Sequence, residues 1–208
     1  MSDTPATPLD DDVPTEVVPP RPASSYPGGP REGRGTPRPV TVMGTPVLHA
    51  TARPVTAFDD ELAAFVDDLF ATMYVAHGVG LAAPQVGDDR AVFVYDCPDD
   101  VGERHVGHVV NPTVVSVSAD VVTEDEGCLS VPGPYFPLER AVTATVRGVD
   151  RHGEAVEVTG SGFFGRCLQH ETDHLRGRLY VDLLSGRTRR RAIREIEPQP
   201  WNAPIPTP

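Results

Sequence analysis

The sequence predicts an α+β domain in which antiparallel strands pack around a central helix. Three observations support this class. Apolar residues recur at helical spacing after residue 56, short runs of β-branched residues follow between residues 91 and 158, and a second helical stretch contains His170-Glu171-x-x-His174. Helices and strands that occupy separate stretches of the chain are typical of α+β domains. A length of 208 residues fits one domain with terminal extensions.

Residues 1–38 are expected to form a disordered tail. They include Asp10-Asp11-Asp12 and Pro27-Gly28-Gly29-Pro30 but few apolar side chains. Such a segment cannot bury enough apolar surface to offset the entropy that it would lose on ordering. The main domain is predicted to span residues 39–185, and residues 186–208 form a basic and then Pro-rich tail.

The first helix of the main domain is expected to begin at Thr56. Its apolar face recurs at helical spacing, and the helix runs for about 18 residues until His77-Gly78. His77 is interpreted as an exposed residue of the last turn. The apolar positions are Leu62, Phe65, Val66, Leu69 and Met73.

The middle of the chain is expected to form strands. Short runs rich in β-branched residues alternate there with Pro, Gly, Asn and Asp, which favour turns. Asp150-Arg151-His152-Gly153 is typical of a hairpin connection. The expected strands are residues 91–95, 106–110, 114–117, 141–146 and 155–158.

The second helix carries the strongest chemical signal. Residues four apart on a helix share one face, so His170 and His174 can bind one metal ion. Glu171 then lies close to a metal-bound water without being a ligand, and Gly177 favours the end of the helix. Two histidines at this spacing can also be ordinary surface or core residues, and the short pattern alone has many chance matches.

Two further stretches bear on the metal hypothesis. Cys128, in Glu126-Gly-Cys-Leu-Ser-Val-Pro132, would complete a Cys-His₂ site with an open fourth position, as a hydrolytic metal requires. A lone cysteine is also commonly a small buried apolar residue. The glycines of the stretch that runs from Gly78 to Gln85 allow close approach of the backbone, although many packed loops share this pattern.

Composition narrows the classes of function. The formal net charge of −12 argues against binding of DNA or other nucleic acid by the body of the protein. The polar, acidic start of the sequence favours neither a signal peptide nor a membrane span. The chain has three cysteines, an odd number, and this favours a cytosolic metal site or a catalytic thiol over disulfides.

Taken together, Gly78-Val-Gly-Leu-Ala-Ala-Pro-Gln85, the Glu126–Ser130 stretch and Gln169-His-Glu-Thr-Asp-His174 resemble the three motifs of the peptide deformylases, in the same order. The resemblance covers residues 40–184 and makes residues 39–185 the catalytic domain. It implies a hydrolase that removes the formyl group from the N-terminal formylmethionine of new polypeptides and releases formate. The setting would be the bacterial cytoplasm, during protein biosynthesis.

The resemblance also implies the roles of individual residues. Cys128, His170 and His174 would hold one divalent ion, typically Fe²⁺, with Zn²⁺, Ni²⁺ or Co²⁺ as substitutes. Glu171 would act as general base and then as general acid. The side chain of Gln85 and the backbone N–H of Leu129 would face the developing oxyanion. Glu126 and Asp173 are candidates for supporting or structural roles.

The expected substrate is a nascent N-formylmethionyl polypeptide. By resemblance it lies extended along Gly78, Val79 and Gly80, main chain to main chain. Phe163 and Cys167 are candidates for the methionine pocket, and they fit equally well as plain core residues. Many relatives carry an arginine seven residues after the motif cysteine, where this chain has Tyr135.

Two other functions remain open from the sequence. A zinc protease could use His170 and His174 with Glu195 as third ligand, but this leaves the Glu126–Ser130 stretch unexplained. The second alternative is a metal-binding relative without catalytic activity, although such a protein would need neither Glu171 nor Gln85.

The C-terminal arginines suggest a partner. Five of them lie in residues 186–197, a dense basic run in an acidic protein that could bind ribosomal RNA electrostatically. A solvated helix face explains the same pattern. The arginines are Arg187, Arg189, Arg190, Arg191 and Arg194.

Overall fold

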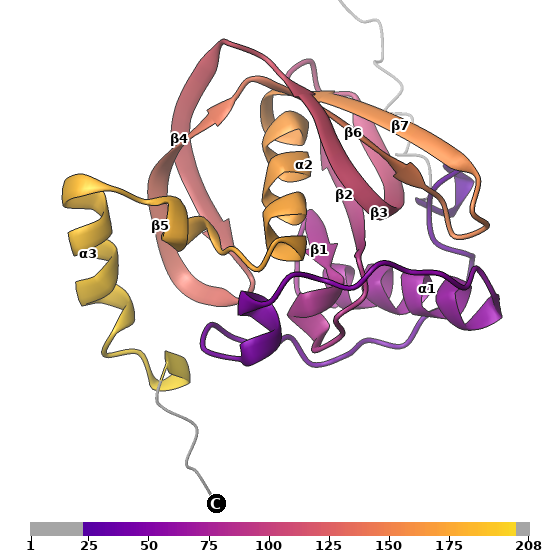
Figure 1. The fold of residues 1–208 in the computed structure, drawn as a ribbon, viewed down its shortest axis with the longest axis horizontal. Coiled ribbons are helices and arrows are strands. Elements are labelled where there is room, and N and C mark those ends of the chain that lie inside the picture. The colour runs from indigo at the N-terminus through magenta and orange to yellow at the C-terminus, as the bar shows by residue number, and fades with distance from the viewer. Residues whose placement is uncertain (1–22, 203–208) are drawn as a thin grey trace, which may run out of the picture.

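The structure is a computed structural model that describes residues 23–202 (Figure 1). It contains long and short helices and seven strands in this part of the chain. In order, they are η1 (Ala23–Ser25), η2 (Pro46–His49), α1 (Asp60–Val75), β1 (Gly80–Ala82), η3 (Ala83–Val86), β2 (Val92–Pro98), β3 (Arg104–Val117), β4 (Val121–Cys128), β5 (Val131–Ala141), β6 (Thr143–Val149), β7 (Ala155–Ser161), α2 (Gly162–Leu175), η4 (Tyr180–Leu183), α3 (Gly186–Ile196) and η5 (Pro200–Asn202).

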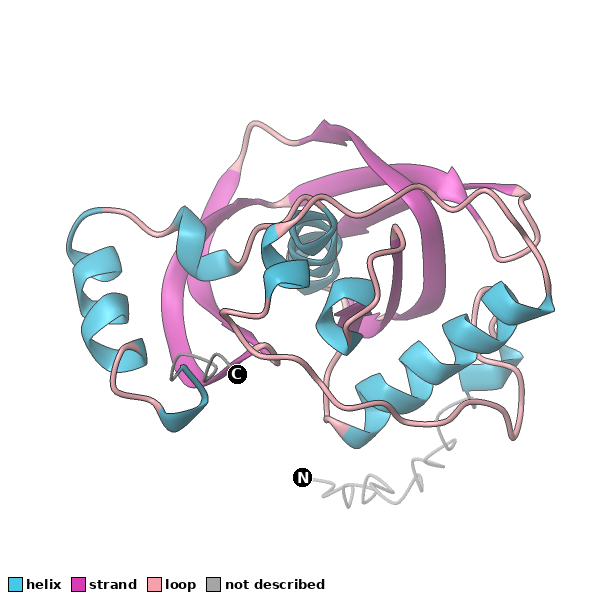
Figure 2. Ribbon diagram, turned by 60° about the horizontal axis from the view of Figure 1, so that its bottom comes forward, coloured by secondary structure: helices cyan, strands magenta, loops and turns pink. Residues whose placement is uncertain are grey.

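The strands form two antiparallel sheets with α2 between them. The larger sheet has the order β1-β2-β3-β6-β7, and β4 and β5 form the smaller one. Helix α2 contacts all five strands of the larger sheet and β5 of the smaller one, and Figures 1 and 2 show it at the centre of the fold. The predicted α+β class, with helices and antiparallel sheets, is confirmed.

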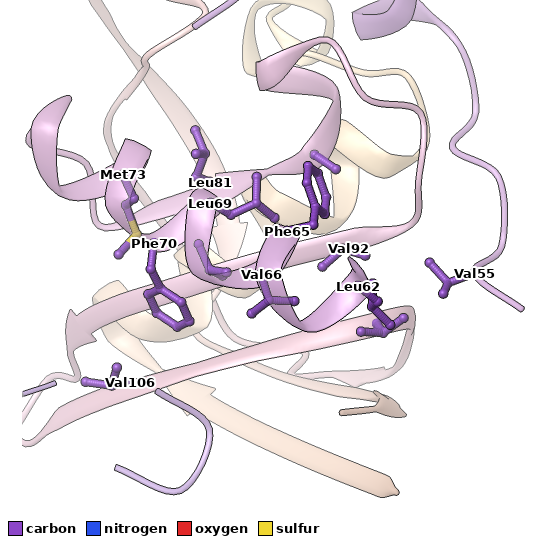
Figure 3. Packing of buried hydrophobic residues seen from close by; sticks show 13 residues of the cluster. Val55, Leu62, Phe65, Val66, Leu69, Phe70, Met73, Leu81, Val92 and Val106 are labelled. Atoms are coloured by element: carbon purple, nitrogen blue, oxygen red, sulfur yellow. The ribbon is translucent and has the colours of Figure 1, made fainter. Parts of the chain in front are cut away.

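Helix α1 packs its apolar face against β1 and β2 of the larger sheet (Figure 3). Phe65, Leu69 and Met73 of the helix are fully or almost fully buried in one cluster with Val92 and Val94 of β2. The helix begins four residues later than predicted. Asp59, rather than Thr56, caps it, since its carboxylate accepts a hydrogen bond from the backbone N–H of Leu62 (3.0 Å).

The smaller sheet was not expected from the sequence. Strand β4 is rich in acidic residues, and β5 contains three prolines, which lack the N–H that a strand interior normally donates. A two-stranded sheet tolerates them because each strand has one unpaired edge. The expected strands 106–110 and 114–117 are instead parts of one strand, β3, with register shifts between them, and the run 141–146 spans the end of β5 and the start of β6.

Residues 23–38 lie against the domain. The backbone N–H and the Nε of Arg31 both donate to Asp67 of α1 (3.0 and 2.6 Å), and the backbone N–H of Arg38 donates to Thr72 Oγ1 (2.9 Å). The other part of the expected tail, residues 1–22, lies outside the described residues. Contacts with the domain therefore begin well before Val40.

The basic C-terminal run forms α3, which packs on the smaller sheet. Ala192 and Ile196 are buried in a cluster with Phe136 and Tyr180, and the five arginines of the helix are all exposed. The end of the predicted tail, residues 203–208, lies outside the described part. Between residues 23 and 202, no helix is both long enough and apolar enough to cross a membrane.

Candidate active site

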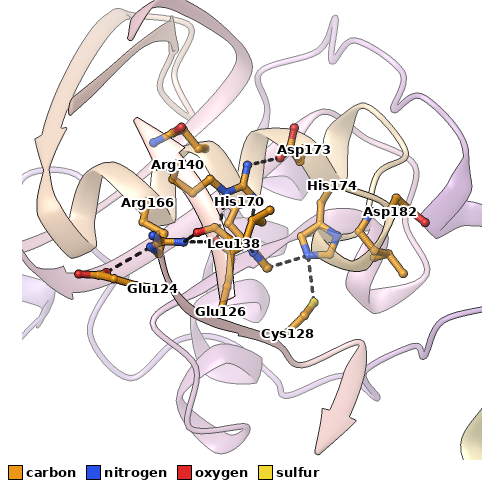
Figure 4. Close-up of polar contacts among 12 residues, drawn as sticks. Glu124, Glu126, Cys128, Leu138, Arg140, Arg166, His170, Asp173, His174 and Asp182 are labelled. Atoms are coloured by element: carbon orange, nitrogen blue, oxygen red, sulfur yellow. Dashed lines mark hydrogen bonds and ion pairs between the residues drawn. The ribbon is translucent and has the colours of Figure 1, made fainter. Parts of the chain in front are cut away.

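Three candidate metal ligands converge between α2 and the end of β4 (Figure 4). The helix places His170 and His174 one turn apart, and their Nε2 atoms lie 3.2 Å from each other. The Sγ of Cys128 lies 3.3 Å from Nε2 of His174. All three donor atoms lie within 4.8 Å of one another. One thiol and two imidazoles directed at one point form a donor set that suits several first-row divalent metals.

Glu126 fixes the orientation of one of these imidazoles. Its Oε1 lies 2.7 Å from Nδ1 of His170, so the proton of the neutral ring resides on Nδ1 and the lone pair of Nε2 faces the other two donors. Burial alone would raise the pKa of Glu126. The hydrogen bonds from His170 and Arg140 more than offset this and lower the pKa well below its usual value.

Two buried arginines hold Glu126 in turn (Figure 4). Arg140 of β5 donates through NH2 to Oε1 (2.7 Å) and through Nε to Oε2 (3.1 Å), and NH1 of Arg166 donates to Oε2 (2.9 Å). The NH1 of Arg140 also binds Asp173 of α2 (2.5 Å). Glu126 and Asp173, which the sequence suggested for supporting roles, therefore belong to one buried ionic network beside the ligands.

Neither arginine was predicted from the sequence as part of the site, although the position of each one is informative. Arg140 continues the alternation of Phe136 and Leu138, which face the interior of the fold. Arg166 precedes His170 by four residues, so both side chains lie on one face of α2. A charged residue at an apolar position of an amphipathic pattern indicates a buried partner of opposite charge.

Gln85 approaches the ligands from the larger sheet. It lies in η3, directly after β1, and is buried. Its Oε1 accepts the backbone N–H of Ala82 (2.8 Å). This contact directs the amide nitrogen toward Cys128, where Nε2 lies 3.6 Å from Sγ. The amide of Gln85 is thus a donor fixed beside the candidate metal site.

Glu171 is buried next to the ligands, and its Oε2 has no hydrogen-bond partner among the described residues. Burial raises the pKa of this carboxyl to about 7. Gly80 leaves the space that the side chain occupies, because a Cβ at this position would lie 2.4 Å from Oε1 of Glu171. The close approach explains why glycine is present at that point of the edge strand β1.

A pocket of about 370 Å³ opens over these groups. Gly78, Val79 and Gly80 line one wall, and Phe163 and Cys167 of α2 line another. Cys167 is buried, whereas the Phe163 side chain is 44% exposed at the opening. Leu129 and Tyr135 belong to the third wall, formed by β4, β5 and their connection. Every residue that the sequence suggested for catalysis or substrate contact lines this pocket, apart from His174 behind it.

The three cysteines, all within the described residues, are free thiols. Glu195 lies away from the ligand group. It is part of α3, where its carboxylate accepts a hydrogen bond from Arg191 (2.6 Å), and the described group around His170 and His174 contains Cys128 as its third member.

The chain is similar to known proteins over most of its length. The family model of the polypeptide deformylases matches residues 37–190. Peptide deformylase 2 of Streptomyces coelicolor is 56% identical over 168 residues, which cover 81% of this chain and 94% of the relative. A peptide deformylase of Mycolicibacterium paratuberculosis is 47% identical over 80% of this chain and 90% of its own.

Solved structures are similar as well. The crystal structure of a peptide deformylase from Legionella pneumophila superimposes with a TM-score of 0.69 at 42% identity and covers 78% of this chain and 94% of the other. That of the enzyme from Ehrlichia chaffeensis gives a TM-score of 0.70 at 32% identity, with 78% and 96% covered.

Proposed function

The chain belongs to the peptide deformylase family, hydrolases that remove the N-formyl group from newly made polypeptides, and we propose how its own residues carry out this reaction. The observation that carries the proposal is the convergence of Cys128, His170 and His174 within 4.8 Å, beside the pocket that Glu171 and Gln85 line. The products are formate and a polypeptide with a free N-terminal methionine.

We propose that the Cys128 thiolate and the Nε2 atoms of His170 and His174 hold one divalent ion. The donor set fits such an ion, because Glu126 keeps the proton of His170 on Nδ1. When bound, the ion supplies a Lewis acid that polarises the formyl oxygen and acidifies water. We infer Fe²⁺ as the native metal from the family resemblance, with Zn²⁺, Ni²⁺ or Co²⁺ as substitutes, because Cys and His suit several of these ions.

Glu171 moves the proton in this scheme. Its Oε2 has no hydrogen-bond partner among the described residues, and the residue lines the pocket. It accepts a proton from the attacking water and delivers it to the methionine nitrogen as the carbon–nitrogen bond breaks. Because burial raises the pKa of this carboxyl to about 7, neither protonation state is strongly favoured near neutral pH, and this suits both steps.

Gln85 and Leu129 stabilise the oxyanion that forms on the former formyl oxygen. The Oε1 of Gln85 is already bound to Ala82 N–H, so the amide group can present only its N–H donors to the pocket. The backbone N–H of Leu129 is the second donor by resemblance. Donors held in place before the reaction need no reorganisation when the charge develops.

The substrate lies along Gly78, Val79 and Gly80. These residues lead into β1, an edge strand of the larger sheet, and an edge strand can pair with an extended peptide. Phe163 and Cys167 border the space for the methionine side chain. The substrate is a nascent chain, so we place the reaction in the bacterial cytoplasm, where formylated chains are made.

The decisive experiment combines metal analysis with turnover of a formyl-Met-Ala-Ser peptide under oxygen-free conditions. We expect one metal equivalent per chain and release of formate. Cleavage of internal peptide bonds without formate would point to a protease. One equivalent of metal without any turnover would point to a silent relative.

We further propose that α3 binds ribosomal RNA. Its five arginines are exposed, while buried Ala192 and Ile196 fix the helix to the smaller sheet. Binding to phosphates weakens with salt by about 0.7–0.9 log units per log[salt] for each contact. Co-sedimentation with ribosomes should therefore fall with salt and with replacement of the five arginines by Gln. Equal pelleting of wild type and variant would refute this partner.

A further inference from the structure

Two cysteines that do not belong to the metal site lie together in the interior of the fold. Cys97 is part of β2 and Cys167 is part of α2, and the helix packs directly on this strand. Both side chains are buried in one cluster with Phe164 and Leu168 of α2, and both are free thiols. The reaction described above uses neither thiol group.

The strand register directs Cys97 toward α2. Tyr95 and Cys97 are two residues apart, so their side chains share one face of β2, and both belong to the cluster that α2 completes. Tyr95 pairs with Gly80 of β1, and the backbone N–H of Asp96 donates to the carbonyl oxygen of Val79 (2.8 Å). Cys97 therefore lies one residue beyond the point where β2 contacts Val79.

The thiol of Cys167 reaches the same point from the helix. Its Sγ donates to the carbonyl oxygen of Val79 (3.8 Å), and a Cβ at Gly80 would lie 2.9 Å from this sulfur. A hydrogen bond with the Cys97 side chain and burial both raise the pKa of Cys167. The two thiol groups are therefore direct neighbours between α2 and β2.

Only one thiol of this pair borders the active-site pocket. Cys167 lines the pocket, whereas Cys97 does not line it and is 1% exposed. A small oxidant that enters the pocket therefore meets Cys167 first. Burial slows the oxidation of this thiol relative to an exposed one, so the pair responds to a sustained excess of oxidant.

We propose that Cys97 and Cys167 are a redox pair that closes to a disulfide under peroxide and thereby reshapes one wall of the methionine pocket. The inference rests on the proposed function, because Cys167 borders the space that is assigned there to the methionine side chain. A reducing cytoplasm keeps thiols open, so the dithiol is the resting state.

The disulfide forms in two steps that consume one molecule of hydrogen peroxide. The sulfur of Cys167 attacks one peroxide oxygen, the O–O bond breaks, and the second oxygen leaves as water with the thiol proton. The sulfur of Cys97 then attacks the resulting sulfenic acid. The S–S bond forms, the S–O bond breaks, and the hydroxyl group leaves as water with the proton of Cys97. The two thiols lose two electrons in total, and the peroxide gains them.

The new bond displaces the sulfur of Cys167. A covalent S–S bond requires a much closer approach than a hydrogen bond between thiols. The sulfur therefore moves toward Cys97 and away from the pocket wall at Gly80. A change of one small group in an apolar pocket alters kcat/KM by roughly tenfold or more. The disulfide should therefore weaken the binding of the methionine side chain and leave the metal in place.

The test treats the Ni²⁺-loaded protein with hydrogen peroxide, because a bound iron would itself react with the oxidant. After free thiols are blocked and the chain is digested, mass spectrometry should find Cys97 and Cys167 in one cross-linked peptide pair that does not include Cys128. For formyl-Met-Ala-Ser, kcat/KM should fall by roughly tenfold, mainly through KM. A dithiol reductant should restore it, and metal analysis should show one equivalent throughout.

The control variant is Cys97→Val, which removes the second thiol at a position that does not line the pocket. Valine suits a buried strand, so kcat/KM without peroxide should equal that of wild type. With peroxide, the sulfenic acid of Cys167 finds no partner and continues to the sulfinic acid, which a dithiol does not reduce. The loss of activity in this variant should therefore be irreversible.

Each other outcome contradicts a definite part of the inference. Cys97 and Cys167 that remain free thiols after prolonged oxidation, or a disulfide that joins either of them to Cys128, would refute the pair. A Cys97–Cys167 disulfide with unchanged kinetics would refute its effect on the pocket. A reduced, metal-loaded protein without turnover would refute the proposed function, while the peptide map would still decide whether the disulfide forms.

Discussion

Two buried carboxylates of this protein are each held by two arginines, yet they do different work. Glu126 lies between Arg140 and Arg166 beside the metal ligands. Asp67 of α1 is fully buried between Arg31 and Arg151, at 2.6 and 2.8 Å. In both places burial alone would raise the pKa of the acid. Contacts with His170 and Arg140 lower it for Glu126, and contacts with Arg31 and Arg151 lower it for Asp67.

The difference lies in what else each network reaches. Glu126 has a further contact with Nδ1 of His170, so its position decides how that imidazole faces the other ligands. The Asp67 network reaches the N-terminal segment instead. Arg151 donates to the carbonyl oxygen of Gly29 (2.8 Å), and Arg31 is itself part of that segment. The same ionic chemistry thus supports a reaction in one region and attaches a stretch of chain in the other.

The largest expected effect is that of Glu126→Gln. The variant removes the shared counter-charge of two buried guanidinium groups, although Arg140 keeps Asp173 and Arg166 keeps Glu124. The free energy of unfolding should fall by up to about 3–5 kcal/mol. The substitution also weakens the contact that fixes the orientation of His170, so metal affinity should fall by about tenfold to a hundredfold. Urea unfolding and competition with a chelator measure the two effects. Wild-type metal affinity in this variant would show that Glu126 does not orient His170 for metal binding.

The matched change in the other network is Asp67→Asn. It should lower the free energy of unfolding by a similar amount, on the order of 3 kcal/mol, because Arg151 is equally buried. Metal affinity and kcat/KM of the remaining folded protein should stay at wild-type values. A loss of metal affinity as large as that of Glu126→Gln would show that the two networks are coupled.

Lowering the pH should destabilise the fold around Asp67, because a neighbouring buried histidine must then bind a proton. His108 is buried, its Nδ1 lies 2.7 Å from the carbonyl oxygen of Gly28, and its Nε2 accepts the backbone N–H of Arg151 (2.9 Å). Burial and the charge of Arg151 lower its pKa from 6.5 to about 4, although the hydrogen bond with Gly28 and the charge of Asp150 oppose this. Between these pH values the unfolded chain binds more protons than the folded one, so stability falls as the pH falls.

This linkage predicts a loss of about 2 kcal/mol in the free energy of unfolding between pH 7 and pH 5 from His108 alone. Other carboxyls also titrate, so His108→Gln serves as the control, since it cannot gain the proton. The difference in pH dependence between wild type and this variant isolates the histidine. Parallel pH profiles would show that His108 does not contribute.

The smallest effect is expected for Arg31→Gln. The Arg31 side chain is 43% exposed. Solvent screening limits the contribution of such an ion pair to the free energy of unfolding to about 0–1 kcal/mol. Asp67 keeps Arg151, so the network is weakened and not broken. Thermal unfolding should show a small decrease, with unchanged turnover. A loss comparable to that of Asp67→Asn would mean that the N-terminal segment is a main support of the fold.

The residues of the two networks also show which parts of the site could be predicted from the sequence and which could not. The metal ligands, Glu171 and Gln85 were named because each belongs to a short motif with its own chemistry. No ionic role was predicted for Arg31, Arg140, Arg151 and Arg166, because their partners are far away in the chain. The Arg151–Asp67 contact, for example, spans 84 positions, and no local pattern encodes such a pair.

The same reason explains the errors in the fold. The α+β class followed from local periodicity, which the helices and most strands of the larger sheet display. Strand β5 contains Pro132, Pro134 and Pro137, and local propensity argues against a strand there. Its pairing with β4 and its packing against α3 decide the outcome, and both are tertiary interactions.

The most direct test of the account is the metal content and turnover of one preparation of Glu171→Gln. Glu171 transfers the proton but does not hold the metal, so the variant should retain one metal equivalent per chain. Its turnover of formyl-Met-Ala-Ser should fall by a factor of about 10²–10⁴. A matched Cys128→Ala preparation should lose both metal and turnover. Loss of the metal from Glu171→Gln would make this residue a ligand and contradict the site as assigned.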